Sequence, residues 1–123
     1  MSFKTLLAYQ KAFELSMEIF DLTKSFPKEE TYSLTDQIRR SSRSICTNIA
    51  EAYRKREYLK HFISKLTDAD SENSETQVWI EFSYSCEYIN LIQQDNLTTK
   101  SLEVGKLINF MIANPEKFGV KKL

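Results

Sequence analysis

The positive side chains near the middle of the chain have the types and spacing needed to bind a polyanion. Guanidinium groups pair bidentately with phosphate, and each phosphate that a protein neutralises adds salt-dependent affinity. Aromatic side chains that could stack on bases are not interleaved with them; only Tyr53 and Tyr58 are close in sequence. The candidate nucleic-acid-binding residues are Arg39, Arg40, Arg43, Arg54, Lys55, Arg56 and Lys60.

The distribution of charge offers these cations a second use. The formal net charge is zero, yet residues 36–65 hold eight cations and three anions, whereas residues 67–96 hold seven anions and no Lys or Arg. The cations could therefore pair with Glu30, Glu51 or the acidic stretch, within one subunit or between subunits. The neutral total favours this pairing over general nucleic-acid binding.

Four polar residues in the same region share one face of a predicted helix. Successive members are seven, four and three residues apart, which places them on one helical face, where they could hold a ligand or form a buried polar seam that fixes the packing of the helix. We favour the structural interpretation. The residues are Gln37, Ser44, Asn48 and Glu51.

Catalysis by acid–base chemistry has one candidate pair. Arg56 and His61 have the R-x4-H spacing of helical-bundle ribonucleases, in which the histidine acts as acid or base and the arginine holds phosphate. Two fixed positions within six residues arise often by chance, and the chain has no second histidine. A ribonuclease is kept as the third hypothesis, and no catalytic residue is assigned.

The acidic stretch raises the question of a metal site. Asp68, Glu72 and Glu75 share a helical face and could bind Mg²⁺ if a facing helix supplied a second acidic pair. The facing candidates Glu14, Glu18 and Asp21 lack such a motif, so a solvated acidic face is expected. One histidine cannot build a di-iron or a typical zinc site. We therefore expect no metal, no cofactor and no enzymatic activity.

The elements that must position these residues are all helical. The chain of 123 residues has 2 Gly and 2 Pro, few helix breakers for its length. Apolar residues recur at three- and four-residue spacing in four segments, and no alternating strand pattern competes. The predicted fold is all-α: one antiparallel up-down-up-down four-helix bundle domain (residues 1–123) with helices at about 4–25, 33–54, 57–92 and 99–113.

Details of the packing are also predicted. Ser41 or Ser42 occupies a core position of the second helix, where a small side chain lets another helix approach closely. The polar middle of the third helix, residues 68–77, is expected to face solvent. Cys46 and Cys86 are read as small buried residues, not as a disulfide.

No membrane association is expected, because the longest apolar runs are only a few residues. The first residues lack the apolar core and cleavage site of a signal peptide. A cytoplasmic location is the expectation.

The second helix and the turn before it resemble a known signature. The stretch FPKEETYSLTDQIRRSSRSICTNIAEAYRKR is similar to the pattern F-P-x-x-E-x-[YF]-x-L-x-x-Q-[IL]-R-R-[AS]-x-x-S-[IV]-x-x-N-I-A-E-G of proteins encoded by 23S rRNA intervening sequences. The first helix and the C-terminal half also look like this family. Two positions depart from the family pattern: Ala52 stands where Gly is common, and Ser71-Glu72 where many members have Gly-Ser.

The resemblance implies a four-helix bundle that assembles into a ring-shaped homopentamer with no established catalytic activity. A related accessory protein of diversity-generating retroelements is a basic pentamer that binds nucleic acid and a reverse transcriptase. The first hypothesis is thus a homo-oligomeric scaffold of unknown cellular role, held by complementary basic and acidic faces and able to take a protein partner. The second is an RNA- or DNA-binding pentamer.

Overall fold

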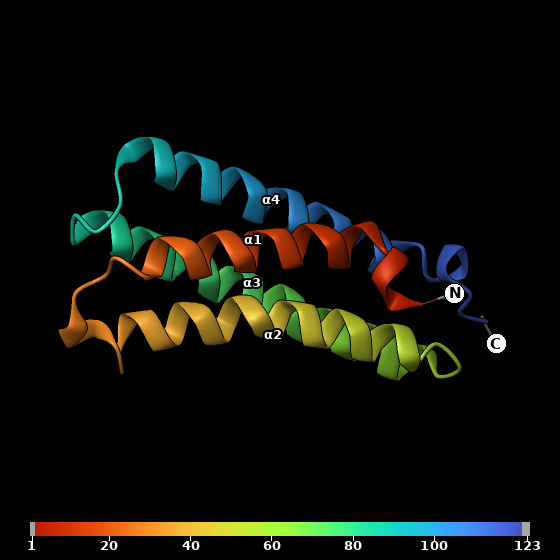
Figure 1. The fold of residues 1–123 in the computed structure, drawn as a ribbon. Helices are drawn as coiled ribbons and strands as arrows, with labels where there is room; N and C mark the ends of the chain where they lie inside the picture. The colour runs from red at the N-terminus through yellow and green to blue at the C-terminus, as the bar shows by residue number, and fades with distance from the viewer. Residues whose placement is uncertain (1, 122–123) are drawn as a thin grey trace.

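The computed structural model describes residues 2–121, and every element of regular secondary structure in this part of the chain is a helix. Four α-helices are joined by short connections: α1 (Leu7–Thr23), α2 (Leu34–Arg54), α3 (Leu59–Ser85) and α4 (Leu91–Ala113). Three 3-10 helices flank them: η1 (Phe3–Thr5), η2 (Lys28–Glu30) and η3 (Pro115–Phe118). Figure 1 shows the helices lying side by side, with both marked ends of the chain at one end of the bundle.

Pairs of contacting residues establish which helices are neighbours. Along α1 and α4, Lys11 pairs with Glu103 while Glu18 pairs with Lys100, so the two helices run in opposite directions. The same reversal holds for α2 and α3, which carry the Arg40–Glu75 and Glu51–Lys65 pairs. The predicted all-α antiparallel four-helix bundle is confirmed.

The core is formed by the predicted apolar stripes. Its largest side chains with less than 2% exposure include Leu15, Ile45, Phe62 and Ile108, one from each helix. Ser41 and Ser42 are fully buried among them, which confirms that small residues let α2 approach its neighbours closely. The Ser16 and Ser42 hydroxyl oxygens lie 3.3 Å apart across the α1–α2 contact.

The predicted third helix, 57–92, is too long at its C-terminal end. Helix α3 ends at Ser85, because Glu87 adopts a left-handed conformation (φ 65°) and reverses the chain. The Tyr88 N–H donates to the Ser83 carbonyl and the Glu87 N–H to the Tyr84 carbonyl, both at 2.9 Å. These two bonds form a Schellman motif, in which the left-handed position is usually glycine.

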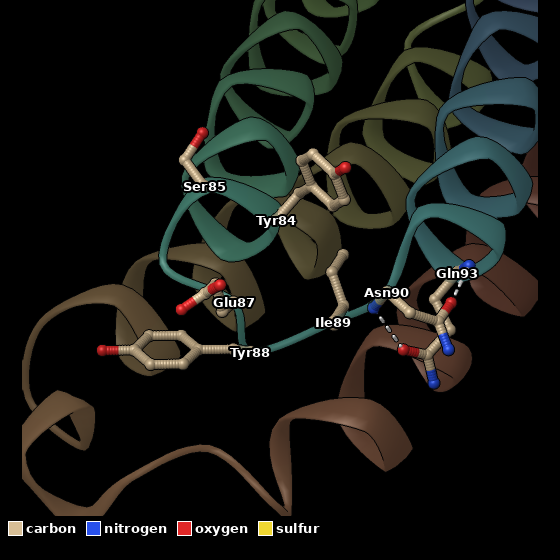
Figure 2. A pocket seen from close by; sticks show the side chains of 7 residues that line it. All are labelled: Tyr84, Ser85, Glu87, Tyr88, Ile89, Asn90 and Gln93. Carbon is tan, nitrogen blue, oxygen red and sulfur yellow. Dashed lines mark hydrogen bonds between the residues drawn. The ribbon is translucent and has the colours of Figure 1, made fainter.

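The predicted fourth helix, 99–113, begins too late. Helix α4 starts at Leu91, so residues 93–98, which the predicted bounds leave between two helices, lie inside it. Asn90 is the N-cap. Its side chain accepts from the Gln93 N–H and the Gln93 side chain accepts from the Asn90 N–H, each at 2.8 Å, a reciprocal capping box. Figure 2 shows both bonds.

The prediction that the polar middle of α3 faces solvent is wrong for part of this stretch. Asn73 and Thr76 are buried. The Asn73 amide donates to the Ser101 carbonyl (2.9 Å) and accepts from the Ser101 hydroxyl (2.8 Å), which ties α3 to α4. The Ser41 and Thr76 hydroxyl oxygens lie 2.8 Å apart and tie α3 to α2. This stretch is polar because its inward side makes buried hydrogen bonds.

Candidate functional site

Arg39 belongs to the predicted basic site, but its guanidinium group contacts uncharged groups of α1. Its Nε donates to the Thr23 hydroxyl at 2.8 Å, and its guanidinium lies 4.7 Å from the centre of the Phe20 ring. Helix α2 points Arg39 toward α1, so this side chain joins two helices. A cation that contacts no carboxylate can still attract an anion at its free edge.

Arg40 forms ion pairs with the acidic stretch of the same chain. Its two terminal nitrogens bind Glu72 at 2.9 Å and Glu75 at 2.6 Å. These bonds raise the Arg40 pKa, the bond to Glu72 contributing most. Burial acts to raise the Glu75 pKa, but hydrogen bonds from Arg40 and Trp79 outweigh it, and the Glu75 pKa is lowered. The pairing alternative therefore describes Arg40, and nucleic acid would have to displace two carboxylates to reach it.

Arg43 remains exposed at the outer side of α2. Its guanidinium lies 5.8 Å from the Phe20 ring centre, and within residues 2–121 it has no ion pair among the salt bridges found. Arg39, Arg40 and Arg43 share an open cavity of about 540 Å³ with one carboxylate, that of Asp36. The remaining lining is polar: Thr31, Thr35, Ser44 and Thr47.

The other predicted cations form a separate cluster at the far end of α2. Arg54, Lys55 and Lys60 are exposed around the turn into α3. Arg43 and Arg54 are eleven residues apart, which is about 16 Å along a helix. The seven candidate residues thus form two clusters and not one continuous surface.

The two residues of the ribonuclease pair, Arg56 and His61, each contact a different tyrosine. Arg56 donates its Nε–H to the Tyr53 carbonyl at 2.7 Å and stacks on the Tyr53 ring. His61, in the first turn of α3, is exposed and its ring centre lies 5.5 Å from that of Tyr58. The structure gives no direct contact between Arg56 and His61.

The predicted polar seam lies at the edge of α2 beside α3, where it is only partly buried. Asn48 donates to the Ser44 carbonyl (2.9 Å) and hydroxyl (3.2 Å), while Glu51 is exposed and pairs with Lys65 at 2.9 Å. Gln37 is half-buried. The fully buried hydroxyls are instead Ser41 and Ser42, outside the predicted set. Their signal was a hydroxyl residue at an apolar step of the stripe.

The α3–α4 corner carries polar contacts that sequence reasoning missed. Tyr88 donates to a Glu30 oxygen at 2.8 Å and its ring centre lies 5.2 Å from that of Phe26, so the corner is tied to the α1–α2 connection. Figure 2 shows Tyr88 extending away from the capping box. Tyr88, Asn90 and Gln93 line an open cavity of about 510 Å³. Hydrogen bonds from Ser33, Tyr88 and the Leu34 N–H lower the Glu30 pKa, and Glu30 raises the Tyr88 pKa to about 12.

The two cysteines differ from each other. Both are free, as expected, but Cys46 is buried and Cys86 is exposed, so the prediction of burial is wrong for Cys86. Cys86 follows the last residue of α3, where the corner turns outward. Burial raises the Cys46 pKa to about 11.

Two surfaces combine exposed apolar side chains with charged ones. On the second of them Glu75 is paired with Arg40, and Glu81 is the acid without a salt bridge among those found in residues 2–121. The aromatic–cationic surface consists of Phe13, Met17 and Phe20 of α1 with Arg39 and Arg43 of α2; Phe13 is 50% exposed and Met17 45%.

The apolar–acidic surface lies on the outer side of α3. It consists of Glu75, Val78, Trp79, Glu81 and Phe82, among which Val78 is 44% and Phe82 52% exposed. The ring centres of Trp79 and Phe82 are 5.8 Å apart. Glu75, Val78 and Phe82 follow one another at three- and four-residue steps, so they share one helical face.

Neither a metal centre nor a membrane span is found in the part of the chain that the structure describes. No three His, Cys, Asp or Glu side chains of residues 2–121 are grouped to hold a metal ion. None of the helices formed by these residues combines the length and the apolar character needed to cross a bilayer.

The sequence and the fold were both compared with those of known proteins. The family described as 23S rRNA-intervening sequence protein matches residues 4–110, most of the chain. The chain belongs to the 23S rRNA-intervening sequence protein family. No curated protein matches it.

A solved structure supports the assignment to this intervening-sequence family. It is a protein of unknown function from the S23 ribosomal protein family of Bacteroides thetaiotaomicron VPI-5482. The two chains are 32% identical and superpose with a TM-score of 0.79, over 87% of this chain and 96% of that one. The predicted family is confirmed.

Proposed function

We propose that this chain is a non-catalytic module whose copies assemble head to tail into a ring, five subunits to the ring as the family resemblance implies. The observation that carries the proposal is the presence of two apolar surfaces with opposite charge on one small bundle. Exposed apolar side chains that gather with a polar rim mark interaction sites. A contact between two different surfaces of identical chains closes into a ring when the rotation permits.

Charge complementarity selects a second copy of the chain as the occupant of each surface. Arg43 lies at the edge of the aromatic–cationic surface and Glu81 at the edge of the apolar–acidic surface, and both are exposed. Opposite charges at the rim favour one register, whereas like charges facing each other disfavour it. The assembled ring would present a scaffold on which a protein partner could bind.

The test is a charge exchange read by light scattering at micromolar concentration. Arg43→Glu and Glu81→Arg should each raise the dissociation constant of the assembly about tenfold, a change of about 1.4 kcal/mol. The double variant should regain much of the loss. Lys106→Glu, an exposed reversal on α4 away from both surfaces, is the control. A wild type that is monomeric at these concentrations would refute the assembly.

A second candidate function, nucleic-acid binding, is favoured by one observation. Arg43, Arg54, Lys55 and Lys60 are exposed, and the salt bridges found in residues 2–121 include none of them. If they bind phosphates, RNA should be retained with an affinity that falls steeply with salt. The variant Arg54→Gln/Lys55→Gln/Lys60→Gln should then lose retention while its oligomeric state is unchanged. Equal retention by this variant would exclude the end cluster as an RNA site.

A further inference from the structure

A cavity of about 300 Å³ lies at the end of the bundle where both marked chain ends are found (Figure 1). It is bounded by η1, the last turn of α2 and η3. Its volume is at the lower limit of small-molecule sites, and its lining is mostly apolar. The lining residues are Thr5, Leu6, Tyr53, Arg56, Lys117, Phe118 and Gly119.

Tyr53 in this lining carries a polar atom without a partner. Its side chain is 4% exposed, and its hydroxyl is the buried side-chain polar atom for which no hydrogen bond is found among the described residues. Buried hydroxyls in folded proteins are nearly always hydrogen-bonded, so each exception calls for an explanation. At a cavity wall, a ligand atom is one such explanation.

Arg56 brings a positive charge to the same wall. Its guanidinium carbon lies 3.7 Å from the centre of the Tyr53 ring, and its Nε is used by the Tyr53 carbonyl at 2.7 Å. Among residues 2–121 no hydrogen bond or salt bridge is found for its two terminal nitrogens, whose donors can serve another acceptor. Lys117 adds a second cation, and the described residues that line the cavity include no Asp or Glu.

Gly119 lets the backbone pass close to this guanidinium. It adopts φ +88°, and a Cβ there would lie 3.4 Å from Arg56 Nη1. A second open cavity of about 460 Å³ shares Arg56 and Gly119 and is lined by two further cations, Arg54 and Lys121, against one acid, Glu57. The electrostatic potential at this end therefore favours an anion.

We propose that the cavity binds a small organic monoanion, a carboxylate on an apolar body. The carboxylate accepts from the terminal nitrogens of Arg56 and from Lys117, and the apolar body packs against Leu6 and Phe118. The Tyr53 hydroxyl is covered by the cavity wall in the structure, so binding moves the four-residue η3 segment outward and gives this hydroxyl its partner. The site is independent of the proposed ring.

The experiment titrates the full chain, labelled for NMR, with 3-phenylpropionate and with the neutral 3-phenylpropanol. The carboxylate should shift the amide signals of residues 53–56 and 117–119 in a saturable manner, and the alcohol should bind at least tenfold more weakly. Tyr53→Phe should weaken binding of the carboxylate about tenfold, as the loss of one hydrogen bond to a charged group does. Lys117→Gln should weaken it by a similar factor.

Lys106→Gln, the same loss of charge at an exposed position of α4 away from both surfaces, is the matched control and should bind like the wild type. Tyr53→Phe removes only an unpaired hydroxyl, so the fold is retained and its binding can be measured. Equal affinity for the acid and the alcohol, or wild-type affinity in Tyr53→Phe, would overturn the proposal. A lack of saturable shifts at residues 117–119 would overturn it as well.

Discussion

Glu30, in the connection between α1 and α2, also binds Tyr88 of the α3–α4 corner. It accepts from the Ser33 hydroxyl (2.5 Å), the Leu34 N–H (3.3 Å) and the Tyr88 hydroxyl (2.8 Å). All three bonds favour its ionised form, which is why its pKa is lowered. The charge on Glu30 thus orders both the start of α2 and the α3–α4 corner.

Replacing Glu30 should make the stability of the protein less dependent on pH in the acidic range. A carboxylate whose pKa is lowered by folding contributes stability above its unfolded pKa and loses it as the pH falls through the folded value. Glu30→Gln should therefore melt below the wild type at pH 6, and the difference should shrink as the pH falls below about 4. Thermal melts followed by circular dichroism measure this. Glu29→Gln, its exposed neighbour, should show no such convergence.

The Ser41–Thr76 pair is the buried link between α2 and α3. Thr76→Val should lower the free energy of unfolding by about 1–2 kcal/mol, because it leaves the Ser41 hydroxyl without its short partner. Ser41→Ala should cost about the same, and the double variant less than the two together. Urea unfolding at a fixed protein concentration measures the cycle. Thr67→Val, at an exposed position of the same helix, should change stability by less than about 0.5 kcal/mol.

At the scale of elements, Gly105 sets the distance between α3 and α4. A Cβ at Gly105 would lie 3.2 Å from the Asn73 amide nitrogen, which is held by Ser101 and cannot easily yield. Gly105→Ala should therefore destabilise the protein by about 1 kcal/mol, although alanine is the better helix former. In an Asn73→Ala background the same change should stabilise by about 0.5–1 kcal/mol. A stabilising effect in the wild-type background would show that the helices can move apart freely.

The end of α3 offers a second prediction. Glu87 is the one residue other than glycine with a positive φ among those described, and its Cβ is strained there. Glu87→Gly should raise the free energy of unfolding by about 0.5–1 kcal/mol. Glu87→Ala keeps the Cβ and should bring no gain. Thermal and urea unfolding distinguish the two variants.

These elements also explain how far the sequence could predict the fold. The stripes of Ile and Leu define four helices and the small serines of α2, because burial of apolar surface decides those positions. The α3–α4 corner escaped prediction because its left-handed residue is a glutamate, which gives no turn signal. The Asn90-x-x-Gln93 pattern was a readable start for α4, yet the apolar residues on both sides suggested one continuous helix.

The candidate site was predictable in type but not in use. Clustered arginines could be read from the sequence, whereas their partners are set by which helices are neighbours. Arg40 meets Glu72, which is 32 residues away, and Arg39 meets Thr23 of another helix. The Tyr53 hydroxyl lacks a partner because of how η1, α2 and η3 pack together, and no local sequence pattern predicts that packing.

At the scale of the whole molecule, charge separation survives folding only in part. Arg40 and Lys100 are neutralised by carboxylates of neighbouring helices, two for each cation. The hydrogen bond that Lys100 donates to Glu18 is the main cause of the raised Lys100 pKa. What remains exposed are cations at the edges of α2 and acids on the outer side of α3, which the proposed ring would bring together.

The assembly should therefore weaken with salt. The Debye length falls from about 10 Å at 0.1 M to about 3 Å at 1 M salt, and exposed ion pairs are screened accordingly. Between those concentrations of NaCl, the dissociation constant of the assembly should rise about three- to tenfold. Light scattering across a dilution series measures it. An assembly that tightens with salt would mean that apolar contacts alone hold it.

The unequal burial of the two cysteines provides a handle for such measurements. The Cys86 thiol is open to solvent beyond the end of α3, whereas the Cys46 thiol is enclosed and its pKa of about 11 keeps it protonated. A maleimide dye added to the native protein should thus attach once per chain, near the α3–α4 corner. Energy transfer between dyes on different chains would then report the diameter of a ring, without any engineered residue.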